Sequence, residues 1–320
     1  MTAVAGKPAG APPVQGAAPA GRTRGRNGRH GLRGRLGRRS ATRASLSTRV
    51  GLNLAALAVF FLSVFPVYWM VLTALSPTTR INSGNENGRP SLVPWPLTFE
   101  HFDKAIRQTN LTDYLWNSLL VSGSTVLASM VVAFLAATAV ARFRFRGRAF
   151  YLVVLMVVQM IPLEALIIPM YLSLRDADAL DKLPSLIAIY LAFVLPFSIW
   201  TLRSFVQGIP VDLEEAAMID GCTRWGAFWR VLFPLVAPGL VATSIFAFVQ
   251  AWNEYIFCLT LMQQGHYTLP VWLGSFTGRE GTDWGGVMAG SSVFTIPVII
   301  FFVLIQRKLT SGLASGAVKG

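Results

Sequence analysis

A short acidic segment, residues 208–221, carries the residue types and spacing that could do work outside an otherwise apolar chain. Asp212 is predicted to be the N-cap of a helix, and Glu215, three residues later, is placed to reach back to the backbone N–H of the cap. Carboxylates in a first turn also favour the positive end of the helix dipole. Gly221 can adopt the left-handed conformation that ends a helix. The sequence therefore predicts a short, rigid helix whose acidic first turn is presented to a partner outside the membrane.

The residues around and after this helix form a spaced pattern. Glu-Ala-Ala at 215–217 is followed by Asp-Gly at 220–221, Phe228, Leu-Phe-Pro at 232–234 and Pro238. The pattern resembles the cytoplasmic loop of permease subunits in ATP-binding-cassette (ABC) importers, where the loop forms a coupling helix that docks into a groove on the ATPase subunit. A capped interfacial helix without a partner is the alternative. The resemblance implies ATPase coupling by Glu214, Glu215, Ala216, Ala217, Asp220 and Gly221.

No catalytic or metal-binding motif accompanies this segment. The sequence has no HExxH, Cys-x-x-Cys or Walker-type GxxxxGK(S/T) motif, and its three histidines are scattered. Cys222 and Cys258 stand alone, which does not suggest a disulfide or a metal pair. We therefore expect no enzyme activity, cofactor or metal, and the resemblance implies a transport subunit whose partners hydrolyse ATP.

The composition indicates a membrane protein. The chain is 53% hydrophobic and 13% charged, whereas a soluble domain is about 25% charged. A spanning helix needs about 20 apolar residues, and six such stretches are present, the third interrupted by Pro162 and Pro169. We expect an all-α polytopic protein whose six-helix transmembrane domain covers 51–305 and includes a coupling loop at 206–234. The predicted spans are residues 51–75, 114–141, 149–174, 184–205, 235–262 and 287–305.

The distribution of charge predicts how these helices are oriented. With the N-terminus inside, the cytoplasmic segments contain 21 of the 28 Lys and Arg residues. Because cytoplasmic loops are enriched in Lys and Arg, we expect both termini in the cytoplasm and the protein in the cell (inner) membrane. The acidic helix then faces the compartment that contains ATP.

Residues 1–50 form a separate segment, rich in Ala, Gly, Pro and Arg and without acidic residues. Such a segment cannot bury enough apolar surface to fold, so it is predicted to be a disordered cytoplasmic tail. Its arginines between Arg22 and Arg49 could bind anionic lipid or nucleic acid. A membrane-anchored regulator that binds DNA through this tail is therefore an alternative. Six spans are more than an anchor requires, and no nucleic acid is expected as a partner.

The C-terminal residues 306–320 are predicted from their composition to be flexible, and they also make the resemblance more specific. They are similar to the end of the six-helix permease subunit of maltose-type carbohydrate importers, and the resemblance extends over about residues 51–320. In that family the tail reaches the ATPase dimer, which implies contacts by Gln306, Gly316 and Lys319; a flexible basic anchor is the alternative. The resemblance also implies a di- or oligosaccharide substrate. The implied partners are a second permease subunit, two ATPase subunits, an extracytoplasmic sugar-binding protein and the lipid bilayer.

A loop rich in glycine and tryptophan, residues 263–286, is predicted to face outside. By resemblance, this loop probes the sugar pocket of the docked binding protein through Trp272, Gly274, Trp284 and Gly285. The alternative is an aromatic belt at the membrane interface.

Two carboxylates, Glu164 and Glu254, lie within predicted spans. An intramembrane carboxylate is expected to face the bundle interior or a water-filled cavity. Together with Asn253 they are candidates for lining the translocation path, or else for holding the bundle together by hydrogen bonds. An ion-coupled secondary transporter that uses the two carboxylates is the alternative function. Such transporters often contain internal repeats, and none is evident here, so the coupling loop favours the importer.

Overall fold

The computed structural model describes residues 46–83, 95–108, 110–278 and 281–316. The chain divides into two units, residues 1–57 and 58–320, and each is considered by itself. The described part of the first unit is the beginning of helix α1, Leu46–Ala74, which continues into the second. Of the predicted tail, residues 1–45 lie outside the described residues, and 46–50 belong to α1.

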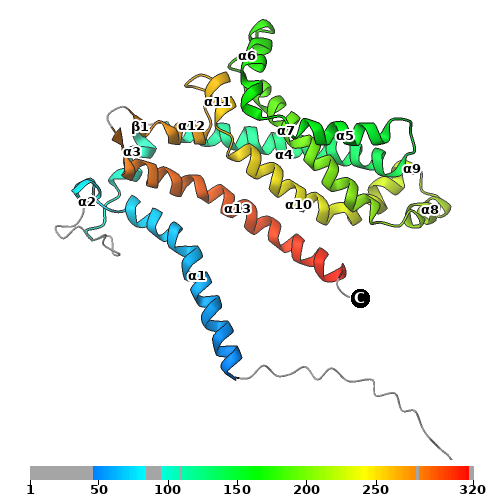
Figure 1. The fold of residues 1–320 in the computed structure, drawn as a ribbon, viewed down its shortest axis with the longest axis horizontal. Helices are drawn as coiled ribbons and strands as arrows, with labels where there is room; N and C mark the ends of the chain where they lie inside the picture. Colours follow the sequence, from blue (N-terminus) through cyan, green and yellow to red (C-terminus); the bar gives the residue numbers. More distant parts are fainter. Residues whose placement is uncertain (1–45, 84–94, 109, 279–280, 317–320) are drawn as a thin grey trace, which may run out of the picture. The chain divides into compact units, whose positions relative to one another are not determined.

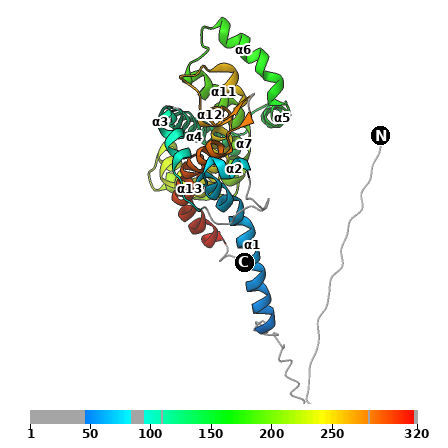
Figure 2. The same cartoon turned by 90° about the vertical axis from the view of Figure 1, so that its left-hand side faces the viewer.

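Helices make up almost all of the described second unit (Figures 1 and 2). After α1 come α2 (Thr78–Ser83), α3 (Glu100–Gln108), α4 (Leu111–Arg142), α5 (Arg148–Val158), η1 (Leu163–Leu166), α6 (Ile167–Asp176) and α7 (Leu183–Gln207). They are followed by α8 (Asp212–Ile219), α9 (Arg224–Ala227), η2 (Phe228–Leu232), α10 (Phe233–Trp252), α11 (Ile256–Leu261), α12 (Leu269–Gly274) and α13 (Trp284–Gly316). Two short strands, β1 (Thr277–Gly278) and β2 (Gly281–Thr282), pair antiparallel before α13. The prediction of an all-α fold is confirmed.

In the described part of the chain, five helical runs are long and apolar enough to cross a membrane, and a bent pair gives a sixth if it is one span. The pair joins α5 to η1 and α6 through a 94° bend. The break, residues 159–162, includes Pro162, whose nitrogen has no hydrogen to continue the helix. Proline thus explains why the third predicted span is bent. The five runs are Thr48–Ala74, Leu111–Arg142, Leu183–Gln207, Arg224–Trp252 and Trp284–Gln306.

The helix predicted at residues 235–262 begins and ends earlier in the structure. It begins at Arg224, because α9, η2 and α10 form one run, and α10 ends at Trp252. The π-helical turn η2 ends two residues before Pro234, and a wider turn relieves the crowding that a proline ring causes in an α-helix. The short α11 is a separate helix. The predicted boundaries were therefore wrong at both ends.

The centre of the second unit is formed by α4, α7 and α10, which contact one another and lie side by side (Figure 1). At one end, Phe134 of α4 stacks on Phe228 of η2, with ring centroids 4.7 Å apart. Gly239 allows α10 to approach α7 closely, since a Cβ there would lie 2.5 Å from the Phe205 ring. This packing holds the ends of α4 and α7 beside residues 208–223, which contain the candidate site.

Candidate functional site

Helix α8 occupies the acidic segment between α7 and α9, outside the candidate spans. Its first turn contains Asp212, Glu214 and Glu215, as predicted. Asp212 is not the N-cap, however. Val211 precedes the helix, and its carbonyl accepts the N–H groups of Glu214 and Glu215 at 2.9 and 3.1 Å. No side chain caps this end, so the predicted capping box was wrong: Val211 is already helical in φ and ψ, and its backbone closes the first turn.

The end of α8 is as predicted. Gly221 has φ +95°, a left-handed conformation that L side chains rarely adopt. Its N–H donates to the Met218 carbonyl at 3.1 Å, and the N–H of Cys222 donates to the Ala217 carbonyl at 2.9 Å. These two bonds satisfy the last carbonyls of the helix and turn the chain sharply toward α9.

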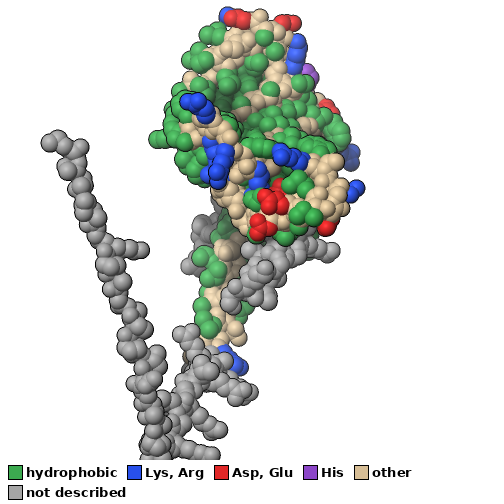
Figure 3. All heavy atoms as spheres, turned by 90° about the vertical axis from the view of Figure 1, so that its right-hand side faces the viewer, with side chains coloured by type: hydrophobic (Ala, Val, Ile, Leu, Met, Phe, Trp, Pro, Cys, Tyr) green, Lys and Arg blue, Asp and Glu red, His purple; other side chains and the backbone are tan. Residues whose placement is uncertain are grey.

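The outer face of α8 combines acidic and apolar side chains. Glu215, Ala216 and Asp220 are exposed, Ala217 is half-buried, and Ile219 is 86% exposed. Figure 3 shows acidic side chains gathered at the end of the unit that carries α8, with basic side chains beside them. Exposed apolar surface rimmed by charge is typical of a protein-binding site.

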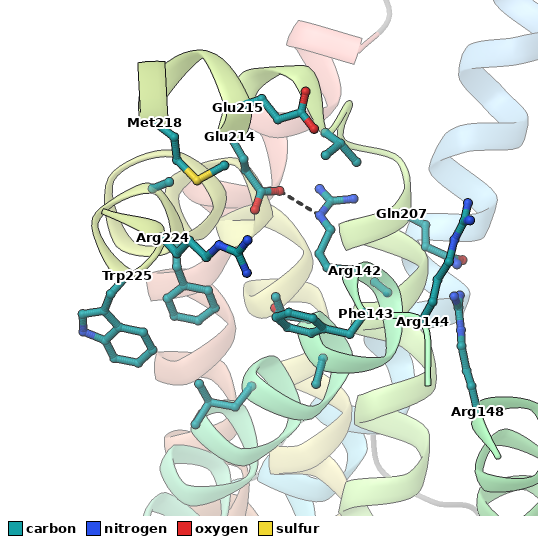
Figure 4. A pocket seen from close by; sticks show the side chains of 17 residues that line it. Arg142, Phe143, Arg144, Arg148, Gln207, Glu214, Glu215, Met218, Arg224 and Trp225 are labelled. Atoms are coloured by element: carbon teal, nitrogen blue, oxygen red, sulfur yellow. Dashed lines mark hydrogen bonds and ion pairs between the residues drawn. The ribbon is translucent and has the colours of Figure 1, made fainter. Parts of the chain in front are cut away.

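Glu214 differs from its neighbour Glu215 because its carboxylate turns into the protein (Figure 4). Arg142, the last residue of α4, donates from Nε to Glu214 Oε1 at 2.7 Å and from Nη2 to the Ile209 carbonyl at 3.0 Å. The Arg142 and Glu214 side chains are 11% and 16% exposed. Both glutamates were predicted to belong to one ATPase-contacting group, and Arg142 was not among the predicted site residues. No local signal pairs it with a residue 72 positions away.

A cavity of about 820 Å³ lies beside this ion pair. Residues of α4, α5, α7, α8 and α9 line it, and Figure 4 shows arginines from several of these elements around it. The exposed Trp225 ring covers one side and stacks on Phe228 with ring centroids 5.2 Å apart. Four arginines against two glutamates make the cavity basic. Its charged lining residues are Arg142, Arg144, Arg148, Glu214, Glu215 and Arg224.

The predicted C-terminal contacts lie at the end of the last described helix and beyond it. Residues 306–316 continue α13, whereas their composition predicted a flexible tail. Strong helix formers at 306–309 and the absence of proline explain the continuation. Gln306 and Gly316 lie on α13, and Lys319 lies outside the described residues. Their contact with an ATPase stays a prediction.

The residues predicted to meet a binding protein do not form one exposed surface. Trp272 is 3% exposed and packs edge-on against Phe276. A Cβ at Gly274 would lie 3.1 Å from the Tyr255 ring, so this glycine also serves packing. Trp284, at the start of α13, is 53% exposed and offers an accessible ring. Contact of these residues with a binding protein stays a prediction.

Gly285, the fourth of these residues, permits a close contact between α3 and α13. A Cβ there would lie 2.0 Å from Cε1 of His101, a buried residue whose Nε2 lies 3.0 Å from the Ser76 carbonyl oxygen. Beside it, Lys104 donates to Asp283 at 2.7 Å. Burial opposes ionisation of Asp283, but the bonds from Lys104 and a backbone N–H outweigh it and lower its pKa. His101 and Lys104 were not among the predicted site residues, since isolated residues in a polar segment carry no local signal.

Glu254 lies at the break between α10 and α11 and holds these elements to α7. Its carboxylate accepts the N–H groups of Phe257 and Cys258 at 2.8 and 3.2 Å, and the hydroxyl of Tyr190 on α7. It therefore satisfies the first N–H groups of α11. This arrangement fits the alternative in which Glu254 holds the bundle together by hydrogen bonds.

The other two candidates for the translocation path also lie at helix breaks. Asn253 directly follows α10 and donates from Nδ2 to the Val249 carbonyl at 2.8 Å. Glu164 is exposed in η1, at the bend of the third span. Whether these side chains face a path for substrate stays a prediction.

Residues 129–314 match the family described as "Binding-protein-dependent transport system inner membrane component". The chain is 47% identical over 277 residues to the diacetylchitobiose uptake system permease protein DasC of Streptomyces coelicolor. The aligned residues cover 86% of this chain and 99% of the relative. It is 36% identical over 261 residues to the trehalose transport system permease protein SugB of Mycobacterium tuberculosis (81% and 93%). It is 32% identical over 283 residues to the trehalose/maltose transport system permease protein MalG of Thermococcus litoralis (87% and 99%).

The fold is also similar to that of a solved structure. A bacterial ABC transporter involved in the import of the acidic polysaccharide alginate superposes with a TM-score of 0.69. The match covers 82% of this chain and 98% of that chain, at 22% sequence identity.

Proposed function

Because the chain belongs to the family of binding-protein-dependent transport inner membrane components, and is a multi-pass permease subunit of a sugar ABC importer in the inner membrane, we propose that its cargo is a disaccharide. Relatives named for diacetylchitobiose, trehalose and maltose support this, since each of these sugars has two rings. Diacetylchitobiose is the first candidate, because its transporter's subunit is 47% identical to this chain. Subunits of this family are not ATPases, and family membership overturns the alternative of an ion-coupled secondary transporter.

The proposed complex contains a second permease subunit, two ATPase subunits and an extracytoplasmic sugar-binding protein. The description of the family as binding-protein-dependent supports the last of these. This chain would form half of the translocation path. A row of exposed apolar side chains on α13 supports burial against lipid or the second permease subunit. The row includes Ile296, Ile299, Ile300 and Leu304.

The proposed topology has six spans and both termini in the cytoplasm, with residues 1–45, which precede α1, as a basic tail on that side. This orientation is supported because it puts 21 of the 28 Lys and Arg residues on the cytoplasmic side. The bent pair of α5 and α6 would then be one interrupted span. The α7–α9 connection, which includes α8, faces the cytoplasm in this topology.

Helix α8 is the proposed coupling helix, and the observation that carries the proposal is its exposed face of acidic and apolar side chains between two spans. Glu215, Asp220 and Ile219 would contact the ATPase, and the small Ala216 and Ala217 would let the helix seat closely. Gln306 and Gly316 of α13, together with Lys319 outside the described residues, would make a second contact.

The proposed cycle converts closure of the ATPase dimer into movement of the spans. ATP closes the dimer, and this closure displaces α8. A short stretch of chain joins α8 to α9, which continues through η2 into α10. The cavity between the permease subunits then opens outward, the binding protein releases the sugar near Trp284, and ATP hydrolysis resets the path inward. The cycle requires that the two states of the ATPase dimer contact α8 differently.

Co-purification tests this proposal. The chain is expressed with the ATPase and permease subunits of its own system, solubilised in mild detergent and isolated with and without Glu215→Lys. We expect the ATPase to be lost on this substitution and the second permease subunit to be retained. The matched control is Glu100→Lys, an exposed glutamate on α3, which should retain both partners. Retention of the ATPase by Glu215→Lys would contradict the assignment of α8.

A further inference from the structure

One guanidinium group joins three elements at the coupling site. Arg142 ends α4, and it donates to Glu214 of α8 at 2.7 Å and to the carbonyl of Ile209, between α7 and α8, at 3.0 Å. In Figure 4 the Arg142 and Glu214 side chains point toward each other at the edge of the cavity. Helix α8 is therefore held by the chain on both sides and also by α4.

The ion pair is shielded from water, unlike an ordinary surface pair. The two side chains are 11% and 16% exposed, so salt screens them less than it screens exposed charges. The planar guanidinium presents several donors in a fixed geometry, which lets Arg142 bind two acceptors at once. Removal of either partner leaves the other charge poorly hydrated, which is more disruptive than the loss of an exposed pair.

Helix α4 is well placed to receive a displacement of α8. It runs for 32 residues, from Leu111 to Arg142, and contacts both α7 and α10 along the centre of the unit. A movement passed to its last residue reaches the packed helices directly, whereas the path through α9 passes the turn at Gly221 first.

We propose that Arg142 and Glu214 form a positioning pair that makes α4 follow α8, while Glu215 in the same turn meets the ATPase. This inference rests on the proposed function of α8 as the docking helix. Without the pair, α8 still docks and the ATPase still turns over, but α8 moves without carrying α4. The amount of sugar moved per ATP hydrolysed then falls.

The charges around the pair supply the controls. Arg144, Arg148 and Arg224 line the same cavity, as does Glu215. Arg144→Ala removes an equal charge from the cavity and leaves the Arg142–Glu214 pair intact. It therefore separates loss of the pair from loss of positive charge.

The test uses the complete transporter in proteoliposomes, with sugar uptake and ATP hydrolysis measured on the same samples. For Arg142→Ala and Glu214→Ala we expect normal assembly, retained ATPase activity, and about a tenfold fall in sugar moved per ATP, within the range of couplings between sites. The double variant should be no worse than either single variant, because both remove one interaction. Arg144→Ala should keep the wild-type ratio.

Three outcomes would overturn the inference. The first is a wild-type ratio of uptake to hydrolysis in both single variants. The second is additive loss in the double variant. The third is loss of the ATPase from Glu214→Ala, which would make Glu214 a docking residue. If Arg142→Ala fails to insert, the same ratio is measured for Glu214→Gln, which keeps the side-chain size and removes the charge. Failure of the docking assignment itself is distinguishable, because Glu215→Lys would then retain the ATPase.

Discussion

Replacing Gly285 with alanine tests whether this residue serves packing or a surface for a binding protein. The added Cβ would lie 2.0, 2.2 and 2.4 Å from Cε1, Nδ1 and Nε2 of His101. Contacts this short with three ring atoms cannot be relieved by a small adjustment. The ring is buried, and its Nε2 lies 3.0 Å from the Ser76 carbonyl oxygen. Either the ring must leave its site or α3 must separate from α13.

The expected destabilisation follows from these contacts. Overpacking a tight site costs about 1–3 kcal/mol, and loss of the ring's hydrogen bond adds about 1 kcal/mol. We therefore expect the free energy of unfolding of Gly285→Ala to fall by about 2–4 kcal/mol, and its Tm to fall by about 5 °C or more.

Thermal unfolding of the purified complex in nanodiscs, followed by tryptophan fluorescence, measures this shift. Gly278→Ala is the matched control, because a Cβ at this exposed glycine of β1 would meet nothing within 4 Å. Adding His101→Ala to Gly285→Ala should cost less than the sum of the two changes, since the clash is then absent. A Gly285→Ala variant with wild-type Tm and reduced response to the binding protein would refute the packing argument and support the surface role.

Three further predictions concern other parts of the chain. Gly221→Leu should uncouple sugar uptake from ATP hydrolysis while the protein inserts normally, because a side chain at φ +95° costs about 1–2 kcal/mol and deforms the end of α8; wild-type uptake at normal protein levels would disprove it. Gly239→Leu should lower Tm, since a Cβ there would lie 2.5 Å from the Phe205 ring; an unchanged Tm would show that α7 and α10 can separate without cost. Burial raises the pKa of Asp181, but its hydrogen bonds from His266 and a backbone N–H lower that pKa below its ordinary value. Its stabilising contribution is therefore present above the ordinary pKa of about 4 and lost as pH falls through the lowered value. The Tm difference between wild type and Asp181→Asn should accordingly be present at neutral pH and shrink below about pH 4, and a difference that grows with acid would contradict this.

Features that depend on neighbouring residues could be predicted from the sequence. The spans follow from runs of apolar side chains, because a helix in the bilayer must be apolar regardless of how it packs against other helices. The end of α8 follows from Gly221, since glycine takes a left-handed conformation without steric cost. The bend in the third span follows from Pro162, which removes a backbone donor.

Features that depend on contacts between distant residues required the tertiary structure. Glu214 and Glu215 are adjacent and chemically equal, yet only Glu214 meets Arg142, 72 residues earlier in the chain. Trp272 and Trp284 belong to one predicted loop, but one is buried and the other exposed because α12 packs against α4 and α13. The sequence by itself determined which segments are apolar, acidic or bent, since these properties belong to a few consecutive residues. Which side chains meet across the helices was decided only by the packing of α4, α7, α10 and α13, where contact depends on helix position and rotation that local sequence does not specify.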